Sequence, residues 1–439
     1  MPFKLKENLL LGTATAATQI EGGDTNNSWY DWSLESTHIA DGTNSLRAVD
    51  HYNRVKSDTD IMAKMGMQIY RLGIEWSRIE PQRGQFDDNA IAHYRNETEL
   101  LIKNGIKPLI TLHHFTNPRW FEEMGAFENP ESPAIFLDFV RYTVEKLADL
   151  VPEWVTVNEP NVYAVNGYIF GTWPPGKKNS LKRLQSVYTN LCACHIGAYK
   201  EIHRIRRKKG FSAHETRVGF ANHVRVFKPK CMWNPLHVIT AAFMKKAFQE
   251  TLTHAMMTGK TSWPVKKLPA KIGDIDISGG RYYDFIGINY YTRDAVVTGK
   301  YIVFAKTPIN DLSWEIYPQG IVELSRRLYA KYSAPIYITE NGTCDNADVF
   351  RSRYIYEHLK VLCESDLPVE RYYHWSFTDN FEWAEGETPR FGLVHVDYET
   401  QKRTVKKSGE FYSAVIKEGG VSQELYDAYV KDCVYRYNV

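Results

Sequence analysis

Two short motifs place a glutamate where it could do chemistry. Residues 156–160 are Thr-Val-Asn-Glu-Pro, and residues 338–342 are Ile-Thr-Glu-Asn-Gly. In each motif the glutamate, Glu159 or Glu340, follows a β-type apolar run and precedes a residue that ends strands. A carboxylate at the end of a buried strand is costly unless it is paired or catalytic. Two of them indicate acid/base and nucleophile chemistry that cleaves glycosidic bonds, whereas the alternative is a pair of unrelated structural salt bridges.

The elements that must position these glutamates alternate along the chain. Short β-type runs are separated by longer segments with apolar residues at three- and four-residue spacing. The predicted strands are Leu9–Thr13, Gln68–Ile74, Lys107–Leu112, Trp154–Val157, Val218–Ala221, Phe285–Ile288, Pro335–Thr339 and Arg371–His374. The predicted helices are Asp58–Met65, Asn89–Lys103, Ile135–Leu150, Leu181–His203, Ile239–Met257, Gln319–Tyr332 and Asp348–Glu364.

This alternation predicts the α/β class, as a single (β/α)8 TIM barrel over residues 1–439 with loop insertions at the C-terminal face. A doubly wound open sheet would also alternate, but the glycine-rich phosphate turn that it needs is not found in the sequence. Reactive side chains of a barrel should lie at the carboxyl ends of its strands. The candidates at these positions are Arg71, His114, Glu159, Asn222, Tyr291, Glu340 and Trp375.

Composition and charge narrow the range of partners. The formal net charge is only +2, which predicts no global attraction to nucleic acid or to an anionic membrane. The basic run at residues 204–209 is interpreted as the solvated end of a helix. Six cysteines form neither a disulfide framework nor a zinc motif, and the adjacent His113 and His114 would point to opposite faces of a strand. We therefore expect no metal or cofactor, no membrane span and a cytoplasmic location.

The motifs together resemble glycoside hydrolase family 1, the retaining β-glucosidases and their relatives, nearly from end to end. Each matching segment is moderately specific, and six in the family's order are very specific. The segments are residues 12–22, 70–79, 156–160, 285–292, 338–342 and 375–386.

The resemblance implies catalytic roles for both glutamates. Glu159 matches the acid/base and Glu340 the nucleophile, and in a retaining enzyme their carboxyls should lie about 5–5.5 Å apart. Glu340 should be ionised, with Arg71 lowering its pKa. Strand alternation predicts that Tyr291, rather than Tyr290, donates a hydrogen bond to Glu340. Glu159 should begin protonated, in a dry site beside a negative charge.

The resemblance also implies a sugar-binding shell. Its hydrogen-bonding members are Gln19, His114, Asn158 and Glu382, and its aromatic members are Trp375 and Trp383. Asn222 and Phe115 are candidates for the aglycone side. Phe115 stands where the family commonly has Trp, a departure that bears on the preferred leaving group more than on the reaction.

The function implied is that of an exo-acting β-glucosidase without a cofactor. It would remove terminal non-reducing β-D-glucosyl residues, with galactosyl and fucosyl residues as further candidates, through a covalent glycosyl-enzyme. The expected partners are small β-glucosides or short oligosaccharides, in a setting of cellulose degradation, while the oligomeric state is left open. The alternatives are a 6-phospho-β-glycosidase, disfavoured because Glu382 would repel a phosphate, and a non-catalytic glycan-binding relative, which usually loses one glutamate. Transglycosylation in place of hydrolysis is also left open.

Overall fold

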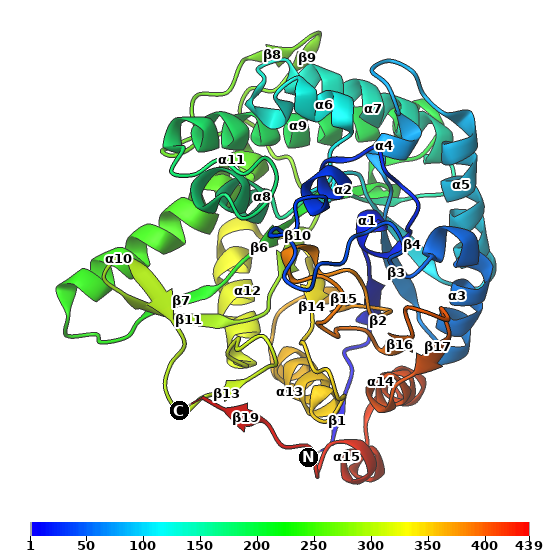
Figure 1. The fold of residues 1–439 in the computed structure, drawn as a ribbon, viewed down its shortest axis with the longest axis vertical. Helices are drawn as coiled ribbons and strands as arrows, with labels where there is room; N and C mark the ends of the chain where they lie inside the picture. The colour runs from blue at the N-terminus through cyan, green and yellow to red at the C-terminus, as the bar shows by residue number, and fades with distance from the viewer. Residues whose placement is uncertain (1, 439) are drawn as a thin grey trace.

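Eight parallel strands close into a barrel at the centre of the molecule (Figure 1). The computed structural model describes residues 2–438. The strands, in order around the barrel and along the chain, are β2 (Leu10–Ala14), β3 (Ile69–Gly73), β4 (Lys107–Thr111), β5 (Glu153–Asn158), β6 (Arg217–His223), β10 (Ile286–Asn289), β14 (Ile336–Asn341) and β15 (Val369–Trp375). Each predicted strand therefore corresponds to a barrel strand, and the predicted TIM barrel is confirmed.

The strands form because their side chains are buried on both faces. Every residue of β3, β5, β10 and β14 is buried, as expected when helices cover a parallel sheet whose interior is filled by side chains. Gly342, directly after β14, allows a close approach of two strands: a Cβ there would lie 1.8 Å from the carbonyl oxygen of Trp375. The glycine of the second glutamate motif therefore lets β14 and β15 bring their carboxyl ends together.

Helices surround the barrel in the predicted order. The larger ones are α3 (His51–Met65), α5 (Asp88–Lys103), α7 (Ser132–Leu147), α9 (Leu181–Lys208), α12 (Gln319–Tyr332), α13 (Arg351–Glu364) and α14 (Lys407–Glu418). Local signals set their ends: the Asp87 side chain accepts from the amides of Asn89 and Ala90 at the start of α5, and Gly66 ends α3 in the left-handed conformation. The segment predicted as one helix, Ile239–Met257, is instead α10 (Pro235–Lys245), a π-type turn (Lys246–Glu250) and α11 (Thr251–Thr258).

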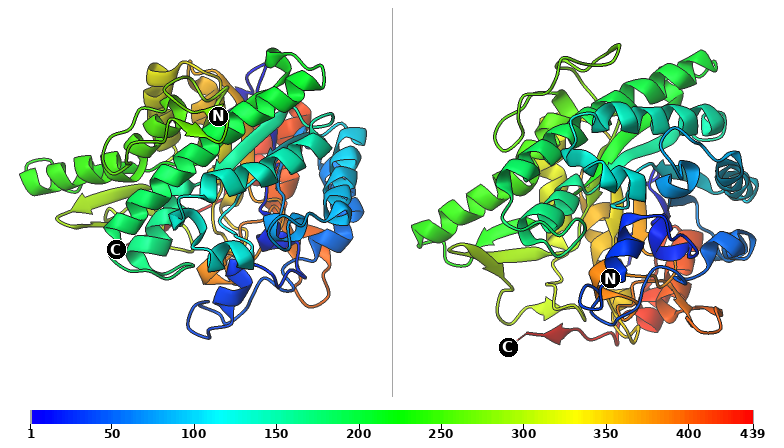
Figure 2. Two further views of the ribbon diagram at one scale, coloured as in Figure 1. Left: turned by 90° about the horizontal axis from the view of Figure 1, so that it is seen from above. Right: turned by 45° about the horizontal axis from the view of Figure 1, so that its top comes forward.

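Insertions at the carboxyl ends of the strands build one side of the molecule. After β6 and β10 the chain forms a small sheet of β7 (Val226–Pro229), β11 (Arg293–Val297) and β12 (Lys300–Ile302). Helix α10 extends from the body beside this sheet (Figures 1 and 2). Within residues 2–438, no helix combines the length and the apolar character that crossing a bilayer would require.

The remaining elements are short. They are helices α1 (Ala17–Ile20), α2 (Ser28–Ser33), α4 (Trp76–Ile79), α6 (Arg119–Glu123), α8 (Pro160–Val165) and α15 (Gln423–Tyr429), and the strand pairs β1–β18 (Phe3–Lys4, Gly420–Val421), β8–β9 (Lys271–Ile272, Ile275–Asp276), β13–β19 (Pro308–Ile309, Arg436–Tyr437) and β16–β17 (Val394–Val396, Arg403–Val405). Single helical turns lie at Ala126–Glu128, Asn166–Phe170, Ala213–Glu215 and Trp383–Glu385. Helix α8 matters most for the site, because it begins directly after Glu159.

Candidate active site

Glu159 and Glu340 line one cavity of about 340 Å³ at the carboxyl ends of the barrel strands. Glu159 lies between β5 and α8, and Glu340 is the last residue but one of β14. Both side chains are buried, with 6% and 3% of the residue exposed. The barrel therefore brings together two carboxyls that are far apart in sequence, as the motifs predicted.

Glu340 is held by a cation and a phenol. Its Oε1 accepts from Arg71 Nη1 at 2.6 Å, and its Oε2 accepts from Tyr291 Oη at 2.6 Å. Tyr290 points away and donates to the carbonyl of Tyr317 at 2.6 Å, which is the alternation expected of this strand end. Arg71 is fully buried and also donates to Asn158 Oδ1 at 2.7 Å, so its guanidinium is fixed in place.

Glu159 has partners that the sequence motifs did not indicate. Its Oε1 accepts from Asn289 Nδ2 at 2.9 Å and lies 3.0 Å from His223 Nδ1. Arg225 Nε donates to His223 Nε2 at 2.7 Å, so Nε2 must be an acceptor and Nδ1 must carry the proton. His223 is therefore the donor to Oε1. The other oxygen of this carboxyl, Oε2, accepts no hydrogen bond within residues 2–438 and is available for a proton.

One hydrogen-bonded network joins the two glutamates. Asn158 Oδ1 accepts from Arg71 and also from Asn289 Nδ2 at 3.0 Å, and these two donors contact Glu340 and Glu159 respectively. Burial and the charge of Glu159 raise the pKa of Glu340 to about 7, against the opposing effects of Arg71 and Tyr291. The two carboxyls thus titrate as a coupled pair.

The pKa values of both glutamates depart from the sequence prediction. Glu340 was expected to have a pKa lowered by Arg71, but burial and Glu159 outweigh Arg71 and raise it. Glu159 was expected to have a raised pKa, and it is lowered. Burial raises this pKa, but the effects of His223, Asn289 and Arg225 outweigh burial and lower it below the ordinary value. The expected dry site and neighbouring negative charge are both present, and the donors on Oε1 oppose them. The motif around Glu159 does not show this, because His223 and Asn289 belong to β6 and β10 and Arg225 to the connection after β6.

Several predicted sugar-binding side chains surround the glutamates with unused hydrogen-bonding capacity. Asn158 Nδ2 donates to His114 Nε2 at 3.0 Å, so the proton of neutral His114 is on Nδ1, which has no partner among the described residues. Gln19 Nε2 donates to Glu382 Oε2 at 3.2 Å, and Gln19 Oε1 is likewise unpartnered. Burial and the charge of Glu340 raise the pKa of Glu382 to about 8. Buried polar atoms without protein partners are suited to binding hydroxyl groups.

Aromatic rings line the rest of the cavity. Trp375 and Trp383 each lie nearly parallel to the His114 ring, with centroids 5.8 Å and 5.9 Å away. Phe115 packs edge-on against Trp383, with the ring centroids 5.2 Å apart. Three bulky lining residues, Phe115, Glu159 and Trp383, have positive φ angles of 66°, 43° and 53°. Backbone strain of this kind is typical of functional sites, where the surrounding structure over-determines the conformation.

A comparison with protein-family models decides the family. The model of glycosyl hydrolase family 1 matches residues 1–421. The chain belongs to glycosyl hydrolase family 1. This confirms the resemblance inferred from the sequence, and the retaining mechanism follows from membership of the family.

Individual relatives of this family 1 hydrolase cover nearly the whole chain. It is 31% identical to β-glucosidase A of Thermotoga maritima, over 95% of this chain and 99% of that protein. It is 28% identical to a β-galactosidase of Pyrococcus woesei, over 95% of this chain and 98% of that protein. Among solved structures, a β-glycosidase from Pyrococcus horikoshii superposes with a TM-score of 0.86 at 31% identity, covering 98% of each chain.

The structure does not bring every predicted residue of the family 1 site to the cavity. Asn222 points outward and donates to Thr253 Oγ1 at 2.8 Å, so its placement on the aglycone side is corrected. The reason is strand alternation: its neighbour His223 is the residue of β6 that faces inward. Gln19, Asn158 and Arg71 lie just behind the lining and contact it through Glu382, His114 and Glu340.

Several other lining residues of the hydrolase were not predicted, among them His223, Arg225, Trp173 and Trp314. Trp173 belongs to a loop and Trp314 to a segment without a predicted element, so no periodicity marked them. For His223 the signal was available: it lies two residues beyond Ala221, the last residue of the predicted strand, and therefore shares the face of Ala221 if the strand continues.

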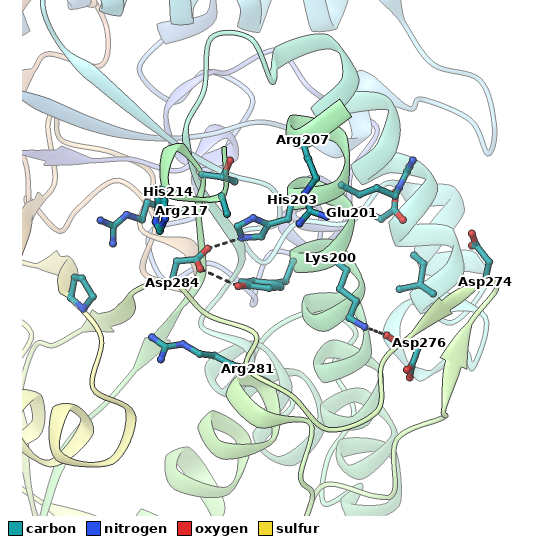
Figure 3. Close-up of a pocket in the computed structure, with 16 residues that line it drawn as sticks. Lys200, Glu201, His203, Arg207, His214, Arg217, Asp274, Asp276, Arg281 and Asp284 are labelled. Atoms are coloured by element: carbon teal, nitrogen blue, oxygen red, sulfur yellow. Dashed lines mark hydrogen bonds and ion pairs between the residues drawn. The ribbon is translucent and has the colours of Figure 1, made fainter. Parts of the chain in front are cut away.

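A larger hollow, of about 810 Å³, lies at the opposite end of the barrel (Figure 3). Two of its carboxylates are paired within the lining: Asp284 accepts from His203 at 2.8 Å and from Tyr199 at 3.0 Å, and Glu201 accepts from Arg204 at 2.6 Å. In TIM-barrel enzymes this end contributes stability rather than chemistry. Within residues 2–438 no cluster of three or more His, Cys, Asp or Glu side chains is arranged to hold a metal ion.

Proposed function

We propose that this family 1 hydrolase is an exo-acting retaining β-glucosidase in which Glu340 is the nucleophile and Glu159 the acid/base. The observation that supports these roles is the shared cavity, in which Glu340 is bound by Arg71 and Tyr291 and Glu159 retains one uncontacted oxygen. The relatives named β-glucosidase A and β-galactosidase support a β-glycoside substrate.

In the first step a carboxylate oxygen of Glu340 attacks the anomeric carbon. The glycosidic C–O bond breaks, and the leaving oxygen takes the proton of Glu159 Oε2, so the aglycone departs as an alcohol. Arg71 opposes the rise in the pKa of Glu340 that burial and Glu159 cause, and Tyr291 orients the carboxylate. The coupled pair shares one proton, which must reside on Glu159 when the substrate is bound.

In the second step water replaces the aglycone. Once Glu340 is esterified it carries no charge, so it no longer raises the proton affinity of Glu159. The pKa of Glu159 then falls further, and its donors on Oε1 stabilise the carboxylate that removes a proton from water. The released sugar keeps its anomeric configuration after two inversions.

We assign the glycone site to the shell around Glu340. The unpartnered atoms Gln19 Oε1 and His114 Nδ1, together with Glu382, are available for sugar hydroxyls, and Trp375 and Trp383 offer ring faces for stacking. Asn158 would reach the 2-hydroxyl, where a hydrogen bond that strengthens in the transition state lowers the barrier. Hydroxyl recognition of this kind also accommodates β-galactosides and β-fucosides.

The alternative of a 6-phospho-β-glycosidase lacks support in the cavity. Arg225 is the only Lys or Arg lining it within residues 2–438, and Arg225 already contacts Asp294 at 3.4 Å. A phosphate dianion needs several cations or amide donors. A non-catalytic glycan-binding relative remains an outcome of the test below, and transglycosylation is compatible with the same covalent intermediate.

The setting of the activity is also a proposal. We propose one catalytic domain over residues 1–439, no cofactor, short cello-oligosaccharides as substrates within cellulose degradation, and a cytoplasmic location. The free state of all six cysteines supports a reducing compartment. A relative named 1,4-β-D-glucan glucohydrolase, 31% identical over 95% of this chain, supports the substrate class.

The direct experiment combines covalent trapping with product analysis. A 2-deoxy-2-fluoro-β-glucoside with an activated leaving group should label Glu340, as located by peptide mass spectrometry. Proton NMR of early product should show the β-anomer. Label on another residue, or α-anomer formed first, would disprove the assignment. No turnover of p-nitrophenyl β-glucoside at any pH would favour the glycan-binding alternative.

A further inference from the structure

An apolar groove of about 290 Å³ continues from the active-site cavity along helix α8. Its lining shares Val162, Asn166 and Arg225 with the lining of the catalytic cavity. Ile169, one turn beyond Asn166, continues the same face. The two hollows are therefore neighbours along one helix.

The position of the groove places it on the leaving-group side. Helix α8 begins directly after Glu159, and Val162 is the first residue of the shared face. Under the proposed function, Glu159 protonates the oxygen of the aglycone, so the aglycone must lie beside this carboxyl. A group that extends from that oxygen past Val162 enters the groove.

The groove is lined mainly by hydrocarbon. The lining opposite α8 comes from α10, the π-type turn that follows it and the loop after α11. Its side chains are Phe243, Met244, Ala247, Phe248, Trp263 and Pro264. Several large apolar residues remain open to solvent here, since Phe243 is 55%, Phe170 47%, Trp263 46% and Leu181 46% exposed. Large apolar side chains that gather around a hollow and stay exposed mark a binding site.

The groove has a single charged side chain, which is already engaged, and one buried hydroxyl without a partner among the described residues, Tyr188 Oη. Arg225 is its only Lys, Arg, Asp or Glu within the described residues; it contacts His223 and Asp294 and lies over the rings of Phe248 and Tyr301. A further sugar unit would need many hydrogen bonds to replace those with water. An apolar chain needs none and gains by leaving water.

We propose that this groove binds the apolar chain of an amphiphilic β-glycoside, so that alkyl or acyl-chain aglycones are preferred substrates. This inference rests on the proposed function and specifies its substrate class. The reaction is unchanged: the chain leaves as the alcohol that took the proton of Glu159. Asn166 and Arg225, at the junction of the two hollows, would face the linker between sugar and chain.

The test is a series of dissolved n-alkyl β-glucosides from butyl to octyl, kept below their micelle concentrations. In the native enzyme kcat/KM should rise about two- to fourfold per methylene while the chain fills the groove. Ala247→Trp, which fills the groove, should flatten this dependence, and Phe243→Ala should weaken it. Ile239→Ala is the matched control, because Ile239 is also an exposed apolar residue of α10 but does not line the groove.

The quantity compared is the slope of log(kcat/KM) against alkyl chain length, taken within each variant. A loss of folded protein lowers every rate of that variant by the same factor and leaves this slope unchanged. A native slope of zero, an Ala247→Trp slope equal to the native one, or an Ile239→Ala slope as weak as that of Phe243→Ala would overturn the inference. Absence of turnover on every glucoside would instead count against the proposed function. A second arm compares glucosyl-diacylglycerol in phosphatidylcholine vesicles with dissolved octyl glucoside, and turnover in the vesicles would identify a membrane lipid as the source.

Discussion

The two ends of the barrel both carry carboxylates at strand termini, but they use them differently. At the amino-terminal end, Asp284 accepts from Tyr199, His203 and the amide of Val218, and Glu153 accepts from Arg371 and Tyr337. At the carboxyl end, Glu159 and Glu340 have protein partners on one side and a cavity on the other.

The difference shows how one fold separates stability from chemistry. The carboxylates at the amino-terminal end use their hydrogen bonds to join strands and helices. The carboxylates at the carboxyl end are buried but accept fewer hydrogen bonds from the protein than they could, and they lie near unpartnered atoms such as His114 Nδ1 and Gln19 Oε1. Stability is lost when buried groups lack partners, and a ligand that supplies them recovers that energy.

The largest effect should follow from Glu340→Gln. The amide keeps the size of the side chain but cannot form the glycosyl-enzyme, so kcat/KM for an aryl β-glucoside should fall by at least about 10⁴-fold. Initial rates measure the loss, and circular dichroism checks that the barrel remains folded. A decrease of less than tenfold in folded protein would remove Glu340 from its role.

A selective effect should follow from Glu159→Gln. Loss of the general acid should cost about 10²–10⁴-fold on alkyl glucosides, whose leaving groups need a proton. The glycosylation step should be spared on 2,4-dinitrophenyl β-glucoside, whose leaving group needs none. Pre-steady-state bursts separate the steps, and equal losses on both substrates would contradict the acid role.

A smaller effect is expected in the pH dependence. The free enzyme should show a bell-shaped profile of kcat/KM, because one proton must be shared by Glu159 and Glu340. His223 lowers the pKa of Glu159, so His223→Leu should raise that pKa. Glu159 acts while protonated and loses its proton as pH rises, and the alkaline limb should therefore move to higher pH.

The measurement is kcat/KM against pH for both proteins. Relative activity on the alkaline side should be several-fold higher in the variant than in the native enzyme. Arg225→Met, which removes a second group that lowers the same pKa, should move the limb in the same direction. A limb displaced to lower pH in either variant would show that His223 and Arg225 do not act through Glu159.

The smallest effect on activity should come from the opposite end of the barrel. Asp284→Asn weakens the hydrogen bonds from Tyr199, His203 and Val218, and the free energy of unfolding should fall by about 1–3 kcal/mol. Turnover at 25 °C should stay within about twofold of native. Urea unfolding and initial rates measure the two quantities, and a large fall in turnover without a change in stability would erase the contrast between the ends.

The sequence by itself determined the barrel and the positions of its two glutamates. The eight strands were visible because each is a short apolar run buried on both faces, and Gly342 and Pro160 marked the ends of the glutamate motifs. Period-two alternation sufficed to separate Tyr291 from Tyr290. These are local signals, carried by residues a few positions apart.

Tertiary structure decided what surrounds each carboxyl. The inward face of β6 carries His223 rather than Asn222, and the chain from Arg225 through His223 to Glu159 depends on the pairing of β5 with β6, whose register brings their carboxyl ends together. The groove beside α8 likewise needs α10, which follows α8 by some seventy positions. Contacts between distant segments are set by packing and register, and a pattern within a single strand or helix does not contain them.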